Sequence, residues 1–209
     1  MSKLVFYTHP QSRGRIVHWM MEELGEVYET VWLEYGSTMK APEYLAVNPM
    51  GKVPALRDGD TVVTESAAIC AYLADRFPQR GLAPPHGDPA RAAYYRWLFF
   101  TAGPLEQATT AKALGWQVPE GRSGMVGFGS LGATLDAVEA ALRPGAHVCG
   151  AQFTAADVML GSALGWGMMF GTIDKRPAFE AYVARLQQRD AAQRALRINE
   201  ARLQSAGKP

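Results

Sequence analysis

The sequence predicts a mixed α/β domain at the N-terminus followed by an all-helical domain. Segments that read as strands lie within the first 64 residues, whereas apolar residues at helical spacing dominate the second half. Between the halves, residues 81–88 read Gly-Leu-Ala-Pro-Pro-His-Gly-Asp, which is the composition of a linker. We therefore expect a first domain at residues 1–80, a linker at 81–87 and a helical domain at 88–209.

The first elements form a strand-helix-strand unit. Leu4–Tyr7 and Tyr28–Leu33 are rich in Val, Tyr, Trp and Phe, as strands are. Between them, apolar residues recur at the spacing of one face of a helix. These residues are Ile16, Trp19, Met20 and Leu24.

A hairpin and a second helix complete this domain. Ala55–Arg57 and Thr61–Thr64 flank the turn sequence Asp-Gly-Asp, which favours an antiparallel hairpin. Apolar residues at helical spacing follow, and Pro78 ends that helix. A β-α-β unit followed by a hairpin and a helix is the order of an α/β thioredoxin-like domain with a mixed four-stranded sheet.

Several apolar stripes in residues 88–209 predict a helical bundle. Thr154 and Asp157 are spaced as a capping box at a helix start, with Phe153 and Val158 as a hydrophobic staple. The principal stripes are Leu131, Leu135, Val138 and Leu142, then Phe179, Tyr182, Val183 and Leu186. Residues 118–129 between the helices are rich in Gly and are expected to form a loop.

The composition excludes several classes of partner. The 209 residues include 21 basic and 20 acidic ones, for a net charge of +1, so no electrostatic attraction to nucleic acid or anionic lipid is expected. Neither a signal peptide nor a membrane span is evident, and a cytoplasmic location is expected. Cys70 and Cys149 lie among apolar neighbours without C-x-x-C spacing, which is typical of reduced core thiols.

One constellation carries a family resemblance. Asn48–Leu56 reads Asn-Pro-Met-Gly-Lys-Val-Pro-Ala-Leu, and after the hairpin Thr64-Glu65-Ser66 opens a helix. This pattern resembles the glutathione-binding half of cytosolic glutathione transferases, and the helical second half with its Thr-x-x-Asp cap extends the resemblance over the whole chain. The resemblance implies glutathione as co-substrate and a homodimer.

The resemblance also assigns glutathione-binding residues. In that family the proline matching Pro54 is cis, and the backbone of the preceding residue, Val53, pairs with the cysteinyl part of glutathione. Glu65 and Ser66 stand at a helix N-terminus, where free amides and the helix dipole suit a carboxylate such as that of the γ-glutamyl group. Two basic residues flanking the Asn-Pro segment are candidates for the glycyl carboxylate. These are Lys40 and Lys52.

The residue that stabilises the glutathione thiolate is expected at the first strand-helix junction. Ser12, in His-Pro-Gln-Ser, resembles the hydroxyl donor of bacterial serine-type transferases of the phi and theta kinds. Tyr7 resembles the donor of the tyrosine-type enzymes, but five residues separate it from Arg13-Gly14-Arg15, two more than their pattern. We favour Ser12 and keep Tyr7 as the alternative. This stretch lacks a cysteine, which disfavours the cysteine-type relatives that form mixed disulfides with glutathione.

The second substrate is expected against the helical half, where aromatic residues are numerous. The spacing of the four histidines fits no metal site, so no metal is proposed. An adaptable apolar pocket suits an apolar electrophile or a hydroperoxide. The residues expected to line it are Tyr94, Trp97, Phe100, Thr101, Trp116 and Phe170.

The resemblance thus implies a glutathione transferase that directs the glutathione thiolate at an electrophile, and it leaves glutathione peroxidase activity open as a second reaction. Two other functions stay open at this point. One is a non-catalytic regulatory or assembly module of the same fold, against which the intact Glu65-Ser66 pair argues. The other is a glutathione-dependent isomerase or dehalogenase, which the sequence does not separate from conjugation because the substrate pocket decides it.

Overall fold

The computed structural model describes residues 3–206, which fall into two compact units. The first unit combines the chain up to Arg80 with the segment from Gln188 onward, and the second is Gly81–Gln187. The structure thus groups the last helix with the α/β unit, whereas the division expected from the sequence kept residues 88–209 together. The segment expected as a linker is tied into the helical unit, because Leu82 O accepts a hydrogen bond from Ala155 N at 2.8 Å.

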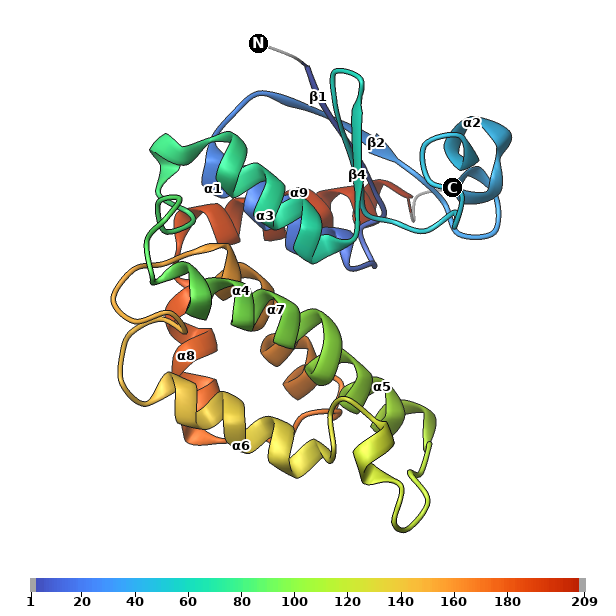
Figure 1. Ribbon diagram of the computed structural model, residues 1–209. Coiled ribbons are helices and arrows are strands. Elements are labelled where there is room, and N and C mark those ends of the chain that lie inside the picture. The colour runs from blue at the N-terminus through green and yellow to red at the C-terminus, as the bar shows by residue number, and fades with distance from the viewer. Residues whose placement is uncertain (1–2, 207–209) are drawn as a thin grey trace. The chain divides into compact units, whose positions relative to one another are not determined.

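The first unit contains the predicted mixed sheet (Figure 1). Its strand order is β2-β1-β3-β4, with β1 parallel to β2 and antiparallel to β3, and with β3 antiparallel to β4. The fold class expected from the sequence is therefore confirmed for this unit. The strands are β1 Leu4–Thr8, β2 Tyr28–Trp32, β3 Ala55–Asp58 and β4 Thr61–Thr64.

Helices cover both faces of this sheet. Phe6 contacts His18 of α1 with ring centroids 5.4 Å apart, while the neighbouring residues Val5 and Tyr7 face the opposite side and pack in one cluster with Tyr44 of α2. This alternation follows from the period of two in a strand. The helices of the first unit are α1 Gly14–Leu24, α2 Pro42–Leu45, α3 Ser66–Arg76 and α9 Asp190–Ala206, with short 3-10 turns at Thr38–Lys40 and Pro78–Arg80.

Helix α9 packs against α1 through charged and polar side chains. Arg189, which directly precedes α9, has its Nε 2.6 Å from Glu23 Oε1, and Nε of Arg194 in α9 lies 2.8 Å from Glu22 Oε2. Asn199 Nδ2 donates to Nδ1 of the buried His18 at 3.1 Å. Burial lowers the pKa of His18 from 6.5, which favours the neutral imidazole beneath α9.

The second unit is all-helical, as predicted. A continuous helical segment runs from Arg91 to Leu114 and includes one π-helical stretch at Pro104, where a proline lacks the amide hydrogen that an α-helix needs. The helices are α4 Arg91–Phe100, η3 Thr101–Leu105, α5 Glu106–Leu114, α6 Leu131–Leu142, α7 Ala155–Met169 and α8 Pro177–Gln187, with a 3-10 turn at Ser123–Met125.

Asp157 anchors the start of α7 and is fully buried. Its carboxylate accepts hydrogen bonds from Thr154 N at 2.9 Å, Val148 N at 2.8 Å and Tyr182 Oη at 2.7 Å. The predicted capping box is present. Because every one of these donors belongs to the framework of the helical unit, the carboxylate serves folding.

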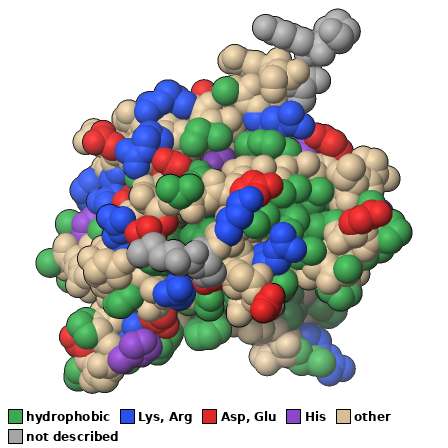
Figure 2. Space-filling model, turned by 90° about the horizontal axis from the view of Figure 1, so that it is seen from above, with side chains coloured by type: hydrophobic (Ala, Val, Ile, Leu, Met, Phe, Trp, Pro, Cys, Tyr) green, Lys and Arg blue, Asp and Glu red, His purple; other side chains and the backbone are tan. Residues whose placement is uncertain are grey.

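Neither the surface charge nor the cysteines point to a further site. On the face drawn in Figure 2, Lys and Arg side chains are mixed with Asp and Glu side chains. None of the helices in residues 3–206 is long and apolar enough to cross a bilayer. Both cysteines are free thiols, and burial raises the pKa of Cys70 to about 12 and that of Cys149 to about 11.

Gly14 provides a test of how closely β1 and α1 approach. A Cβ atom at this position would lie 1.9 Å from Thr8 Oγ1, so we expect Gly14→Ala to destabilise the protein by about 1–3 kcal/mol through overpacking. The measurement is the midpoint of urea unfolding. Gly132→Ala in α6 is the matched control, because the nearest atom would lie 4.0 Å away and alanine favours a helix. Equal stability of the two variants would contradict the close approach.

Candidate functional site

The strand register gathers three separate segments at one edge of the sheet. Tyr7 pairs with Ala55, and Ala55 pairs with Thr64 on its other side. Because β3 runs antiparallel to both β1 and β4, the carboxyl ends of β1 and β4 lie beside the amino end of β3. The loop that follows β1, the segment that enters β3 and the start of α3 therefore meet at this edge.

The segment entering β3 contains the Val53–Pro54 peptide bond, which is cis. The preceding carbonyl, Lys52 O, accepts hydrogen bonds from Tyr44 Oη and from Asn48 Nδ2, the latter at 2.8 Å. By contrast, the backbone N–H and C=O of Val53 make no hydrogen bond within residues 3–206. Val53 thus carries an unused donor and acceptor at the sheet edge, which is what an extended peptide requires for pairing.

The start of α3 presents the second predicted pair. Glu65 is exposed and has φ = 69°, and within residues 3–206 it is the one non-glycine residue in the left-handed region. Such a backbone costs about 1–3 kcal/mol and concentrates at functional sites. Ser66 is buried as the first residue of α3. The strained residue places its carboxylate next to the positive end of a helix.

The two predicted lysines differ in their surroundings. Lys40 Nζ donates to Met50 O and Gly51 O, both at 3.0 Å, so its ammonium group closes the loop that leads to β3. Lys52 is exposed and forms no hydrogen bond or ion pair through its side chain in the described part of the chain. Lys52 therefore has the more available charge for a ligand.

Ser12 lies in the loop between β1 and α1 and is partly exposed. Its hydroxyl donates to His9 O at 2.7 Å and accepts from Gly14 N at 3.0 Å. The side chain thus accepts from the first amide of α1 and closes the turn that leads into this helix, while it stands at the sheet edge. A hydroxyl has a single proton, so Ser12 can donate to a ligand only by leaving His9 O.

Tyr7 sits in a different environment. It is 8% exposed, belongs to the cluster on the α2 side of the sheet and contacts the Tyr44 ring at a centroid distance of 5.6 Å. A strand residue so enclosed contributes to the core. Both candidate donors therefore lie near the sheet edge, but Ser12 is the more accessible.

The predicted aromatic pocket residues separate in the structure. Tyr94, Trp97 and Thr101 are buried, with exposed fractions of 4% or less, whereas Phe170 is 72% exposed and Phe100 is intermediate. Trp116 lines a cavity of about 790 Å³ within the helical unit. Of the six residues named from the sequence, Trp116 is therefore the one that borders this cavity.

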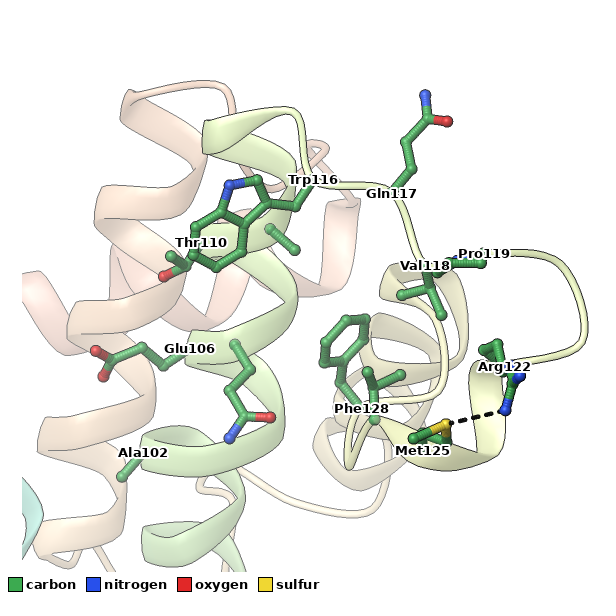
Figure 3. A pocket seen from close by; sticks show the side chains of 13 residues that line it. Ala102, Glu106, Thr110, Trp116, Gln117, Val118, Pro119, Arg122, Met125 and Phe128 are labelled. Atoms are coloured by element: carbon green, nitrogen blue, oxygen red, sulfur yellow. Dashed lines mark hydrogen bonds between the residues drawn. The ribbon is translucent and has the colours of Figure 1, made fainter.

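This cavity lies between α5 and residues 116–128. Figure 3 shows the Trp116 ring beside Thr110 of α5, with Val118 and Phe128 on the opposite wall. The Gly-rich composition of residues 118–129 predicts only a loop, and it gives no sign that apolar residues at both ends of this segment form the second wall. The remaining lining residues are Ala102, Glu106, Gln107, Ala111, Gln117, Pro119, Arg122, Met125 and Val126.

Comparison with known proteins identifies the family. The family model described as "Glutathione S-transferase, N-terminal domain" matches residues 12–76, and the C-terminal domain model matches residues 106–185. Glutathione S-transferase GstA of Escherichia coli O157:H7 is 34% identical over 156 residues, which cover 74% of this chain and 77% of that protein. The chain belongs to the glutathione S-transferase family.

Solved structures of glutathione transferases share the architecture of this one. The glutathione transferase of Methylococcus capsulatus matches with a TM-score of 0.78 at 32% identity, covering 95% of this chain and 99% of that one. A sphingomonad glutathione S-transferase complexed with glutathione matches with a TM-score of 0.77 at 30% identity, covering 94% and 98%. The fold and the enzyme class predicted from the sequence are thus confirmed.

Proposed function

We propose that this glutathione transferase binds glutathione along the sheet edge and stabilises its thiolate with the Ser12 hydroxyl. The observation that carries the proposal is the convergence of Val53, Glu65-Ser66 and the Ser12 loop through the register of β1, β3 and β4. Glutathione is an extended peptide with two carboxylates, one ammonium group and one thiol. The edge offers a complementary group for each of them.

The contacts follow from the groups left available. The Val53 backbone pairs with the cysteinyl part, because its N–H and C=O are unused within residues 3–206. The amides at the start of α3, with Ser66, receive the γ-glutamyl carboxylate, and Glu65 receives the adjacent ammonium. Lys52 attracts the glycyl carboxylate, while Lys40 supports the loop and adds positive potential beside it.

In the proposed mechanism the Ser12 proton turns from His9 O to the glutathione sulfur. Gly14 N–H keeps donating to Ser12 Oγ, which polarises the hydroxyl and strengthens it as a donor. This hydrogen bond lowers the pKa of the thiol, so a larger fraction is thiolate. The thiolate then attacks an electrophilic carbon, forming an S–C bond while the leaving group departs with the bonding pair.

The serine-type assignment is supported by what lies in the β1–α1 loop. Residues 8–14 read Thr-His-Pro-Gln-Ser-Arg-Gly and contain no cysteine. Cys70 is fully buried with a raised pKa, which suppresses thiolate formation there. A mixed disulfide with glutathione is therefore not part of the proposed mechanism.

Replacement of Ser12 tests the mechanism directly. We expect Ser12→Ala to lower kcat about 10- to 100-fold with a chloronitroaromatic substrate, because one donor to the developing charge is lost, while the Kd for glutathione stays within about twofold. Tyr7→Phe is the control, and we expect it to keep kcat near that of the parent. Glu65→Ala should instead raise the Kd for glutathione. Steady-state kinetics and titration calorimetry measure both quantities. Unchanged turnover in Ser12→Ala would exclude its role.

We further propose that the cavity beside Trp116 accepts the apolar electrophile. We expect Trp116→Ala to raise the KM for the chloronitroaromatic about fivefold and to leave the KM for glutathione unchanged, because one aromatic contact contributes about 1 kcal/mol. Phe170→Ala is the matched control, since Phe170 is exposed and does not border the cavity. Equal KM values for the two variants would place the electrophile elsewhere.

A homodimer is the proposed assembly. Tyr95 and Phe99 lie one turn apart on α4 and are 39% and 71% exposed, which leaves an apolar surface suited to a partner. We expect light scattering to give twice the chain mass of 22.8 kDa, and Phe99→Glu to shift the protein toward the monomer. Phe170→Glu changes an equally exposed phenyl group and serves as control. A monomeric parent protein would refute the dimer.

A further inference from the structure

His9 determines where the Ser12 hydroxyl stands. The carbonyl oxygen of His9 accepts two hydrogen bonds from Ser12, from its amide at 3.2 Å and from its hydroxyl at 2.7 Å. The His9 side chain is nearly buried, although it lies in a loop. A displacement of the His9 backbone would therefore carry the Ser12 hydroxyl with it.

The His9 ring is fixed from several sides. Its Nδ1 accepts a hydrogen bond from Gln11 N at 3.1 Å, which places the proton of the neutral ring on Nε2. Nε2 lies 3.4 Å from Glu34 Oε2. The ring packs on Tyr35 at a centroid distance of 4.5 Å, and Tyr35 Oη donates to Gln11 O at 3.2 Å. Both ring nitrogens face protein groups, which suits orientation rather than proton transfer to a substrate.

Glu34 is itself oriented by the C-terminal helix. Glu34 Oε1 accepts from Arg202 of α9 at 3.1 Å, and Glu34 N donates to Thr38 Oγ1 at 2.7 Å. The Arg202 guanidinium also lies 5.8 Å from the centroid of the Trp32 ring. A continuous series of contacts therefore leads from α9 through Glu34 and His9 to Ser12, over 190 positions of sequence.

We propose that His9, oriented by Glu34 and Arg202, is a positioning residue that fixes the Ser12 loop so that the hydroxyl can turn to the reactive sulfur. This inference rests on the proposed role of Ser12. His9 acts through the loop backbone and does not touch the substrate in this arrangement. Helix α9 thereby contributes to catalysis without entering the sheet edge where glutathione binds.

The arrangement predicts a specific kinetic effect. Loss of the contacts displaces the hydroxyl but leaves Val53 and Glu65 in place, so the thiol becomes a weaker acid while the KM for glutathione hardly changes. The Arg202 and Glu34 side chains are 33% and 47% exposed, and an ion pair so accessible to water adds little to stability. Its removal should therefore leave the fold intact.

The test compares variants by two measurements. The first is the pH dependence of kcat with 1-chloro-2,4-dinitrobenzene. The second is the ultraviolet absorbance of the glutathione thiolate after glutathione is added to protein that has been dialysed free of it. We expect Arg202→Met and His9→Ala to lower kcat about three- to tenfold at neutral pH and to raise the apparent pKa of the bound thiol. At alkaline pH, where the thiolate forms without help, the difference should shrink. His9→Asn should restore part of the activity, because its amide oxygen can still accept from Gln11 N.

Arg194→Met is the matched control, since it removes another α9 ion pair, to Glu22, away from the Ser12 loop. We expect it to keep the parent pH profile. If Arg194→Met and Arg202→Met lower kcat equally at every pH, the effect comes from the packing of α9 on the first unit and not from the Ser12 loop, and the inference is overturned. If the melting temperature or circular dichroism of a variant shows misfolding, Glu34→Gln replaces it, because this substitution preserves the shape of the side chain. A thiol pKa in Glu34→Gln equal to that of the parent would also overturn the inference. If Ser12→Ala leaves the pKa of the bound thiol unchanged, the proposed role of Ser12 is wrong. If Ser12→Ala raises this pKa but the Arg202 and His9 variants leave it unchanged, Ser12 keeps its role and only the inference about His9 is wrong.

Discussion

The candidate site depends on one structural constraint, the pairing of β3 between β1 and β4. The row Tyr7, Ala55 and Thr64 aligns the ends of three strands, and each residue proposed to contact glutathione lies a few positions from that row or in a loop attached to it. A slip of β3 by one residue would turn its side chains to the opposite face. It would also move Val53 away from the start of α3. The buried side chain of Leu56 opposes such a slip, because it pairs with the buried Phe6 across β3 and β1 and would lose its apolar surroundings.

The parts of the fold that were predictable are those with local signals. The Asp-Gly-Asp turn defines the hairpin, the spacing of Ile16 and Met20 defines α1, and Thr154 with Asp157 marks the start of α7. The position of α9 has no such signal. Arg194 of this helix and the preceding Arg189 contact Glu22 and Glu23, which lie 172 and 166 positions earlier in the chain. Charged residues on a helix are compatible with a solvent-exposed face as well as with an ion pair, so sequence periodicity alone cannot assign this helix to the first unit.

At the candidate site, the sequence likewise identifies residues but does not give their hydrogen bonds or their burial. Sequence motifs pointed to Ser12, Val53 and Glu65, but not to the bonds that each already makes or lacks. The use of Lys40 in closing a loop depends on two carbonyl groups ten and eleven positions away. For the aromatic residues, composition could not separate Tyr94, which is fully buried, from Trp116, which is 66% exposed and borders a cavity. Both are equally plausible pocket residues until the packing of the helices is known.

The proposed catalytic role of Ser12 agrees with its place in the fold, because accepting from the first amide of a helix and stabilising a thiolate place the same demand on the side chain. Each function needs a small hydroxyl at the start of α1, beside amides whose dipoles point toward negative charge. Gly14 N–H donates to Ser12 Oγ whether the hydroxyl proton rests on His9 O or on a sulfur, so only one hydrogen bond changes between the two states. The cost of that exchange is small because a bond to an anionic sulfur replaces a bond to a neutral carbonyl. A hydroxyl held ready in this way loses little orientational freedom when glutathione arrives, provided that the His9 carbonyl holds it in the correct place beforehand. The proposed role of Ser12 therefore also needs the contacts of His9 with Gln11, Tyr35 and Glu34, because these contacts keep the His9 carbonyl in place.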